Sequence, residues 1–230
     1  TPLHPTEEQR APYRDLPEPK QTYYSVITNA DRQIGRLLEA LDDMGLADDT
    51  LVIFSSDNGP ETIRTDFGTY GSTGGLRGRK RSLFEGGVRT PFIARWPGHT
   101  PAGAVDDRSL LSAVDLFPTF LAVAGVPFPA DWPLDGVDIS DALHGRPFER
   151  PAPLMWEWRF AHPQTGDFWP SAAIRDGRYG LIANPGQDRW ELYDLLSDRA
   201  QEHDLAADMP DRVDRLRIRL EEWSRALPSN

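Results

Sequence analysis

The segment at residues 51–59 constrains the fold most, because it joins a short apolar run to a polar turn. Its first four residues, Leu-Val-Ile-Phe, are apolar, and two of them are β-branched. Such a run predicts a short, fully buried strand, which fits the middle of a parallel sheet covered on both faces. The polar turn at residues 55–60 then follows the carboxyl end of this strand, where open α/β sheets bind their ligands.

Two residues of this turn have the chemistry of metal ligands. Asp57 and Asn58 each offer a side-chain oxygen, and oxygen is the ligand that hard cations such as Ca²⁺ and Mg²⁺ prefer. The Asp-Asn-Gly sequence is also common in turns that bind nothing, because these residues tolerate positive φ. Both interpretations remain open from this segment alone.

The segments around this strand alternate helix and strand. Residues 21–44 place apolar side chains on one helical stripe and end at Gly45. Residues 90–96 predict another strand, and residues 115–124 a helix with Asp115 as its N-cap. Residues 1–20 hold five prolines, which predicts an extended surface segment with little regular structure.

The C-terminal third has a different pattern, with short apolar stretches and an Asp176-Gly177 turn typical of a hairpin. A last amphipathic helix begins near Pro210. We therefore predict an α/β fold with two parts. Residues 1–150 form part of a parallel-type mixed sheet with flanking helices, and residues 151–230 form a small antiparallel sheet with one helix.

A long glycine-rich stretch, residues 60–90, separates the two predicted strands of the first part. It contains Arg77, Arg79, Lys80 and Arg81, a basic run within an acidic protein. One interpretation is a solvated basic loop. The other is an anion pocket, in which glycines let the backbone approach a ligand and a lysine supplies a point charge.

Composition excludes several classes of protein. The formal net charge of −11 argues against general nucleic-acid binding, which needs a basic face. The chain has no cysteine, so disulfides, thiolate metal sites and cysteine nucleophiles are excluded within it. No apolar run reaches the roughly 18 residues of a membrane span, and no signal peptide is visible.

Three motifs in order resemble those of the type I sulfatases, the formylglycine-dependent, arylsulfatase-like branch of the alkaline phosphatase superfamily. They are Ser56-Asp57-Asn58-Gly59, then Leu76-Arg77-Gly78-Arg79-Lys80, then Glu85-Gly86-Gly87-Val88-Arg89-Thr90-Pro91. Weaker matches follow at residues 115–119, 134–138 and 190–195. The resemblance implies an alkaline-phosphatase-like fold and a sulfuric ester hydrolase, of which this chain is the C-terminal part.

The resemblance also implies roles for particular residues. Asp57 and Asn58 match the family's metal ligands, usually for Ca²⁺, with Mg²⁺ as an alternative. Lys80 matches a catalytic lysine that contacts the substrate's sulfate, so the expected partner is a small-molecule or carbohydrate sulfate ester. A divalent cation and a nearby lysine would both stabilise the anionic centre of such a reaction. The Glu85–Arg89 motif is interpreted as support for the loop beneath the site.

The chain departs from the family pattern in what it lacks. The formylglycine nucleophile derives from a C/S-x-P-x-R motif, which is absent here. The first pair of metal-binding aspartates would lie upstream, and the sulfate-contacting histidine would immediately precede Thr1. His4 lies too far along the chain to be that histidine and is interpreted as a surface or substrate-binding rim residue, with a catalytic role as the alternative because histidine titrates in a range that suits acid–base work. We expect the missing N-terminal part of the same protein to supply these groups.

Two alternative functions remain open. One is a phosphate or phosphonate monoester hydrolase of the same superfamily, although the five histidines lack the spacing of di-zinc ligands. The other is a non-catalytic binding module of the same fold. An aromatic cluster could line a sugar or aryl pocket, or pack the small sheet against the main domain. Its members are Trp156, Trp158, Phe160, His162, Phe168 and Trp169. The family resemblance favours a periplasmic or secreted location.

Overall fold

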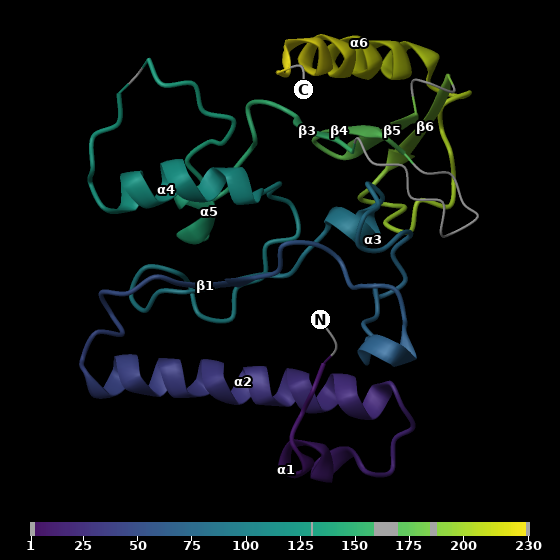
Figure 1. Cartoon of the computed structure of the whole chain (residues 1–230). Coiled ribbons are helices and arrows are strands. Elements are labelled where there is room, and N and C mark those ends of the chain that lie inside the picture. The colour runs from purple at the N-terminus through teal and green to yellow at the C-terminus, as the bar shows by residue number, and fades with distance from the viewer. Residues whose placement is uncertain (1–2, 130, 159–169, 185–187, 229–230) are drawn as a thin grey trace.

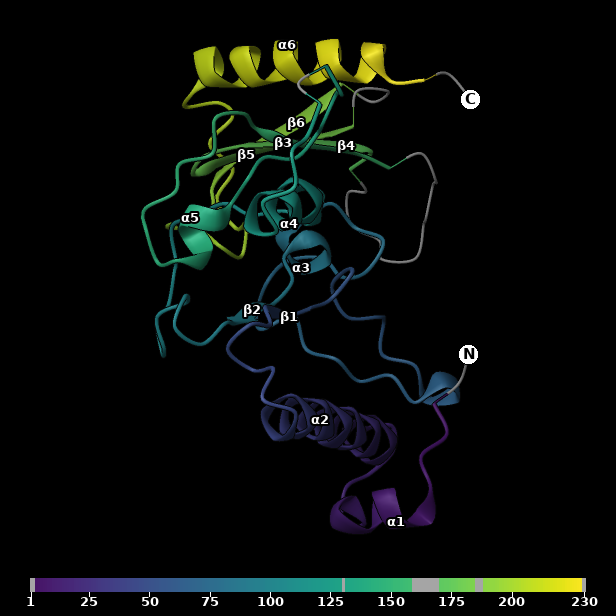
Figure 2. The same ribbon diagram turned by 90° about the vertical axis from the view of Figure 1, so that its left-hand side faces the viewer.

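The computed structural model describes residues 3–129, 131–158, 170–184 and 188–228. In the first part, the strand pair β1–β2 lies between α2 on one side and α4 and α5 on the other (Figures 1 and 2). The elements of this part are α1 (Glu7–Arg10), α2 (Lys20–Asp43), β1 (Val52–Ser55), α3 (Glu85–Val88), β2 (Phe92–Arg95), α4 (Leu116–Val123) and α5 (Ser140–Leu143). This alternation of helices and strands confirms the predicted α/β class. Among the described helices, none has the length and apolar character needed to span a membrane.

The strand pair differs from the sequence prediction in its burial. β1 pairs with β2 in an antiparallel register that sets Val52 opposite Arg95 and Ser55 opposite Phe92. Phe54 is 45% exposed and Ile93 is 60% exposed. The predicted full burial of residues 51–54 is therefore wrong for the described residues. The physical reason is that β1 and β2 form a two-stranded sheet, so neither has neighbours on both sides.

The second part is an antiparallel sheet in the order β3-β4-β5-β6. Its elements are β3 (Leu154–Glu157), β4 (Ala172–Asp176), β5 (Tyr179–Asn184), β6 (Arg189–Asp194) and the helix α6 (Pro210–Ala226). α6 covers one face of the sheet and α3 lies on the opposite side (Figure 1). The small antiparallel sheet with one helix, predicted from the sequence, is confirmed.

Alternating side chains give this sheet two packed faces. On the α6 face, Ile174, Leu181 and Leu192 form one buried cluster with Leu216 and Leu220 of the helix. On the other face, a residue of each strand adjacent to these belongs to a second cluster, together with the loop before α3. That cluster comprises Leu83, Phe84, Ala173, Ile182, Tyr193 and Leu195. The loop that precedes α3 is therefore part of the core of the C-terminal sheet.

The N-terminal segment has more regular structure than its prolines predicted. α1 begins after Thr6, whose hydroxyl accepts a hydrogen bond from the backbone N–H of Gln9. The Gln9 side chain accepts in return from the backbone N–H of Thr6, which completes a capping box. The prediction of an extended segment is wrong here, because reciprocal capping stabilises a short helix before Pro12.

Asp115 has a different role from the predicted N-cap of α4. Its side chain makes no capping hydrogen bond to that helix. Instead the fully buried carboxylate accepts from the backbone N–H groups of Ser112 and Val137, at 2.7 and 3.0 Å. Arg150 donates to it at 2.6 Å and is itself 4% exposed. Asp115 thus joins three separate segments around one buried ion pair.

Candidate functional site

The turn after β1 presents two oxygen ligands that no other described group engages. Asp57 is exposed, and no other described residue donates a hydrogen bond to its carboxylate or forms an ion pair with it. The Asn58 Nδ2 donates to the carbonyl oxygen of Gly59 at 2.9 Å. This bond fixes the orientation of the amide and leaves Oδ1 open as an acceptor. The Ser56 hydroxyl donates to the Asn58 carbonyl at 3.0 Å, which further orders the turn.

Glycines let this turn approach α3 closely. The Gly59 N–H donates to the Gly87 carbonyl at 2.8 Å. A Cβ at Gly59 would lie 1.8 Å from the Gly86 carbonyl oxygen, so no larger residue fits without a shift of the backbone. A Cβ at Gly86 would lie 2.6 Å from the carbonyl oxygen of Arg77, and one at Gly87 would lie 2.0 Å from that of Ser82 in the glycine-rich loop. Both loops of the candidate site therefore pack against the two glycines of α3.

The three arginines of the basic run make internal contacts. Arg77 donates to the Tyr193 hydroxyl at 2.9 Å and to Glu191 at 3.2 Å. Arg79 donates to the Gly71 carbonyl at 2.6 Å. Arg81 forms a bidentate pair with Glu61, at 2.5 and 2.8 Å. The run is therefore not a uniformly solvated loop, because its arginines fix the loop to neighbouring segments.

Lys80 is the cation that this arrangement leaves available. Its backbone N–H donates to the Pro60 carbonyl at 3.1 Å, which places it beside the turn that carries Asp57 and Asn58. Its side chain is 38% exposed, and Nζ lies 4.0 Å from a carboxylate oxygen of Glu61. Hydrogen bonds from Arg81 lower the pKa of Glu61 to about 2, so this carboxylate is ionised at neutral pH.

The described residues hold at most part of a metal site. They contain no group of three or more His, Cys, Asp or Glu side chains placed to hold a metal. The carboxylate of Asp57 and the amide oxygen of Asn58 do fit Ca²⁺ or Mg²⁺, because both are hard oxygen ligands and neither is engaged by another described residue. A complete coordination shell would need further ligands.

His4 is not part of this constellation. It is exposed and lies in the N-terminal segment, which the hydrogen bond from Leu3 N to Phe67 O holds against the glycine-rich loop at 3.2 Å. No contact joins His4 to Lys80 or to the Asp57–Asn58 turn among the residues that the structure describes. Its placement on the rim stays a prediction.

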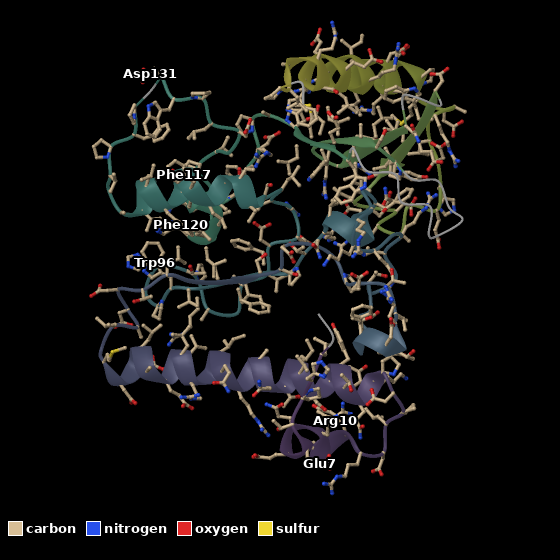
Figure 3. The ribbon with its side chains drawn as sticks, viewed as in Figure 1. Glu7, Arg10, Trp96, Phe117, Phe120 and Asp131 are labelled. Carbon is tan, nitrogen blue, oxygen red and sulfur yellow. The ribbon has the colours of Figure 1, made fainter. Side chains whose placement is uncertain are left out.

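The aromatic cluster is only partly described. Trp156 and Trp158 pack against the buried cluster on the α3 side of the C-terminal sheet, as the packing alternative predicted for them. The remaining four aromatic positions lie outside the described residues. Other aromatic side chains are exposed on α4, namely Phe117 and Phe120, and Phe120 is on the side of Trp96 (Figure 3).

Sequence reasoning missed the contacts from the C-terminal sheet to the site loops. The Gln201 Oε1 accepts from the backbone N–H of Glu85 at 2.7 Å. The Glu85 carboxylate accepts from Arg89 at 3.0 Å and from Arg175 at 3.4 Å. Burial lowers the pKa of the Arg175 guanidinium. Because Gln201 is 116 residues from Glu85 in the chain, no local sequence pattern could have indicated this contact.

Comparisons with known proteins agree with the geometry. Residues 3–126 match the family model described as Sulfatase, and residues 78–225 match the model of the C-terminal part of N-sulphoglucosamine sulphohydrolase. Human arylsulfatase A is 42% identical over 153 residues, which are 66% of this chain and 28% of that protein. Human N-acetylgalactosamine-6-sulfatase is 42% identical over 130 residues, 56% of this chain and 24% of that protein.

Solved structures give the same result over most of the chain. The protein Ps i-CgsB, solved in complex with k-i-k-neocarrahexaose, superposes with a TM-score of 0.82 and 29% identity over 97% of this chain and 47% of that one. A protein solved with its substrate D-glucosamine-2-N,6-O-disulfate has a TM-score of 0.65 and 25% identity over 95% of this chain and 45% of that one. The chain thus spans less than half the length of these relatives. Because one family model matches more than half of it, the chain belongs to the sulfatase family.

Proposed function

We propose that this chain is the C-terminal part of an enzyme that hydrolyses sulfate monoesters with a divalent cation. The observation that carries the proposal is the hydrogen bond from Lys80 N to Pro60 O, at 3.1 Å. It joins the backbone of Lys80 to the residue that follows Gly59, and Lys80 is the one basic residue of the run whose side chain no hydrogen bond holds among the described residues. A site for an anionic ester needs metal ligands and a basic side chain close together.

The residues divide the work as follows. Asp57 and Asn58 would hold the cation, Ca²⁺ or Mg²⁺, through the carboxylate and Oδ1. When bound, the cation supplies Lewis-acid stabilisation of the sulfate oxygens. Lys80 would contact the sulfate directly, and Glu61 holds its ammonium group nearby when no anion is bound. His4 belongs to the rim of the site rather than to its chemistry.

The other groups of the site would come from outside these 230 residues. The formylglycine nucleophile and the remaining metal ligands belong to an N-terminal part of the same protein, which would also cover the exposed side chains of β1 and β2. Residues 1–150 would then complete the catalytic domain, and residues 151–230 form a smaller subdomain. The substrate class is a small-molecule or carbohydrate sulfate ester, supported by the sugar-sulfate ligand of one structural relative. A periplasmic or secreted location accompanies this proposal.

The test is Lys80→Ala in the complete protein, assayed with an aryl sulfate and with the matching aryl phosphate. Removing a preorganised charge at the reacting anion should lower kcat/KM for the sulfate by about 10²- to 10³-fold. Lys20→Ala is the matched control. Lys20 is the first residue of α2, and its ammonium group lies over the Tyr70 ring, so this substitution should leave kcat/KM unchanged.

Two outcomes would contradict the proposal. If Lys80→Ala retains wild-type kcat/KM for the aryl sulfate, Lys80 does not contact the reacting group. If the wild-type protein cleaves the phosphate in preference to the sulfate, the enzyme is a phosphate monoester hydrolase of the same fold.

A further inference from the structure

The helix α3 begins without a cap of its own. Its N-cap residue is Phe84, which has no polar side chain and makes no capping hydrogen bond. The orphan N–H of Glu85 is instead satisfied by Gln201, whose Oε1 accepts it at 2.7 Å. Gln201 lies in the connection between β6 and α6, so the C-terminal part of the chain supplies the cap that the local sequence lacks.

Gln201 has an environment that stability alone does not explain. It is 2% exposed and has a φ of +57°, which is unfavourable for any residue other than glycine. Its Nε2 is buried and has no hydrogen-bond partner among the described residues. An unsatisfied buried donor and a left-handed backbone both cost stability, and such costs concentrate where a precise geometry matters for function.

Arg77 provides a second link from the same sheet to α3. Its Nη1 donates to the Tyr193 hydroxyl of β6 at 2.9 Å and to the backbone carbonyl of Gln201 at 3.4 Å. Its own carbonyl accepts from the N–H of Gly86 at 2.7 Å. Its guanidinium lies 3.9 Å from the centre of the Phe84 ring. The start of α3 is therefore held between Gln201 and the loop that Arg77 fixes.

The position of α3 in turn sets the position of the candidate site. Gly59 donates to Gly87 at 2.8 Å and has no room for a Cβ against Gly86. The backbone N–H of Lys80 donates a hydrogen bond to the carbonyl oxygen of the next residue of the turn, Pro60. A shift of α3 by a few tenths of an ångström would therefore move the Asp57–Asn58 turn, and with it the spacing between these ligands and Lys80.

We propose that Gln201 is a positioning residue for the candidate site, acting through its hydrogen bond to the Glu85 N–H at the start of α3. The inference rests on the proposed function, because it names the residue that sets the geometry of that same site. It assigns the C-terminal sheet a role in the reaction. The sheet holds α3, and α3 holds the metal-ligand turn and the lysine.

The experiment compares two substitutions of Gln201 in the complete protein. Gln201→Met keeps the side-chain length but cannot accept a hydrogen bond, whereas Gln201→Glu keeps an acceptor oxygen at the same place. Misplacement of a reacting group by about 1 Å can cost about 100-fold in rate. We expect Gln201→Met to lower kcat for an aryl sulfate at least about 10-fold with a smaller change in KM, and Gln201→Glu to restore most of it.

Amide hydrogen exchange provides a readout that does not depend on activity. In Gln201→Met, the Gly59 amide in the peptide covering residues 56–60, and the amides of residues 84–88, should exchange at least about 10-fold faster, while β5 and β6 keep their protection. Gln33→Met, an exposed change on α2, is the matched control and should alter neither rate. Exchange is measured on wild type and variants without substrate.

Two results would overturn the inference. The first is unchanged exchange at residues 56–60 in Gln201→Met, because the turn would then be held without Gln201. The second is an equal loss of kcat in both variants together with lost protection across β5 and β6, which is the behaviour of a residue needed only for folding. If the wild-type protein hydrolyses no sulfate ester, the proposed function fails, and the exchange at residues 56–60 still decides whether Gln201 positions the turn.

Discussion

Two isoleucines in antiparallel strands illustrate how differently the two parts of this chain are packed. Ile174 in β4 is 1% exposed, whereas Ile93 in β2 is 60% exposed. The C-terminal sheet has α6 on one face and the loop before α3 on the other, so its core is complete within the chain. The β1–β2 pair has helices to both sides (Figures 1 and 2), yet Phe54 and Ile93 remain exposed. A layered arrangement alone does not bury a strand, because burial also needs neighbouring strands.

The largest expected effect tests this difference in packing directly. Ile174→Ala should lower the free energy of unfolding by about 2–5 kcal/mol, because it leaves a cavity between the sheet and α6. Ile93→Ala removes the same atoms from an exposed site and should change it by no more than about 0.5 kcal/mol. Urea denaturation of the 230-residue chain measures both. Equal losses would mean that the two parts are packed to the same degree.

Two glycines give a second matched pair, with effects of opposite sign. Gly59 lies against the Gly86 carbonyl, so Gly59→Ala forces the turn away from α3 and should cost about 1–3 kcal/mol. Gly35 lies inside α2, and a Cβ there would meet no other segment of the chain within 4 Å. Gly35→Ala should therefore stabilise the helix by about 0.5–1 kcal/mol. Denaturation midpoints test both signs, and a stabilising Gly59→Ala would contradict the close approach.

The sequence predicted the elements better than their environment. Local sequence patterns located α2, α4, α6, the strands β1 and β2 and the β4–β5 hairpin, because each pattern is local to its segment. The polar turn at Asp57 and the basic run around Lys80 were identified from residue type and family resemblance, and a hydrogen bond from Lys80 N to Pro60 O joins these two loops. The exposure of β1 was missed. An apolar run indicates that a strand is stabilised by burial, but it does not indicate whether neighbouring strands are present to bury it.

Long-range contacts were the part that sequence could not supply. Asp115 has the residue type of an N-cap, but its partner Arg150 is 35 residues away and turns it into a buried ion pair. Gln201 and Glu85 are 116 residues apart. Local patterns state what a side chain can do, whereas its partner is chosen by the fold. Asp115 and Gln201 both join separate segments, which is where local reasoning has least information.

The smallest expected effect concerns acid stability, and it compares one carboxylate from each part. Hydrogen bonds from Arg81 lower the pKa of Glu61 from 4.5 to about 2, and Arg178 likewise lowers the pKa of Asp194 to about 2. A carboxylate whose pKa is lowered in the folded state stabilises the fold at pH values above its ordinary pKa of 4.5, and this stabilisation is lost as the pH falls toward 2. Glu61→Gln should cost less than about 1 kcal/mol at about pH 7, because the pair is partly exposed.

The same change should cost much less near pH 2, where wild-type Glu61 is itself becoming protonated. Urea midpoints at several values between about pH 7 and pH 2 measure the trend, and Asp194→Asn provides the matched series in the C-terminal sheet. Glu61 fixes the site loop, whereas Asp194 fixes a hairpin of a complete sheet. Loss of the Glu61 pair, by acid or by Glu61→Gln, should therefore speed hydrogen exchange at residues 56–60, and loss of the Asp194 pair should not. Faster exchange at residues 56–60 in Asp194→Asn would mean that the two parts unfold as one cooperative unit. The contrast between Ile174 and Ile93 would then reflect a difference in burial only, and not two parts that unfold separately.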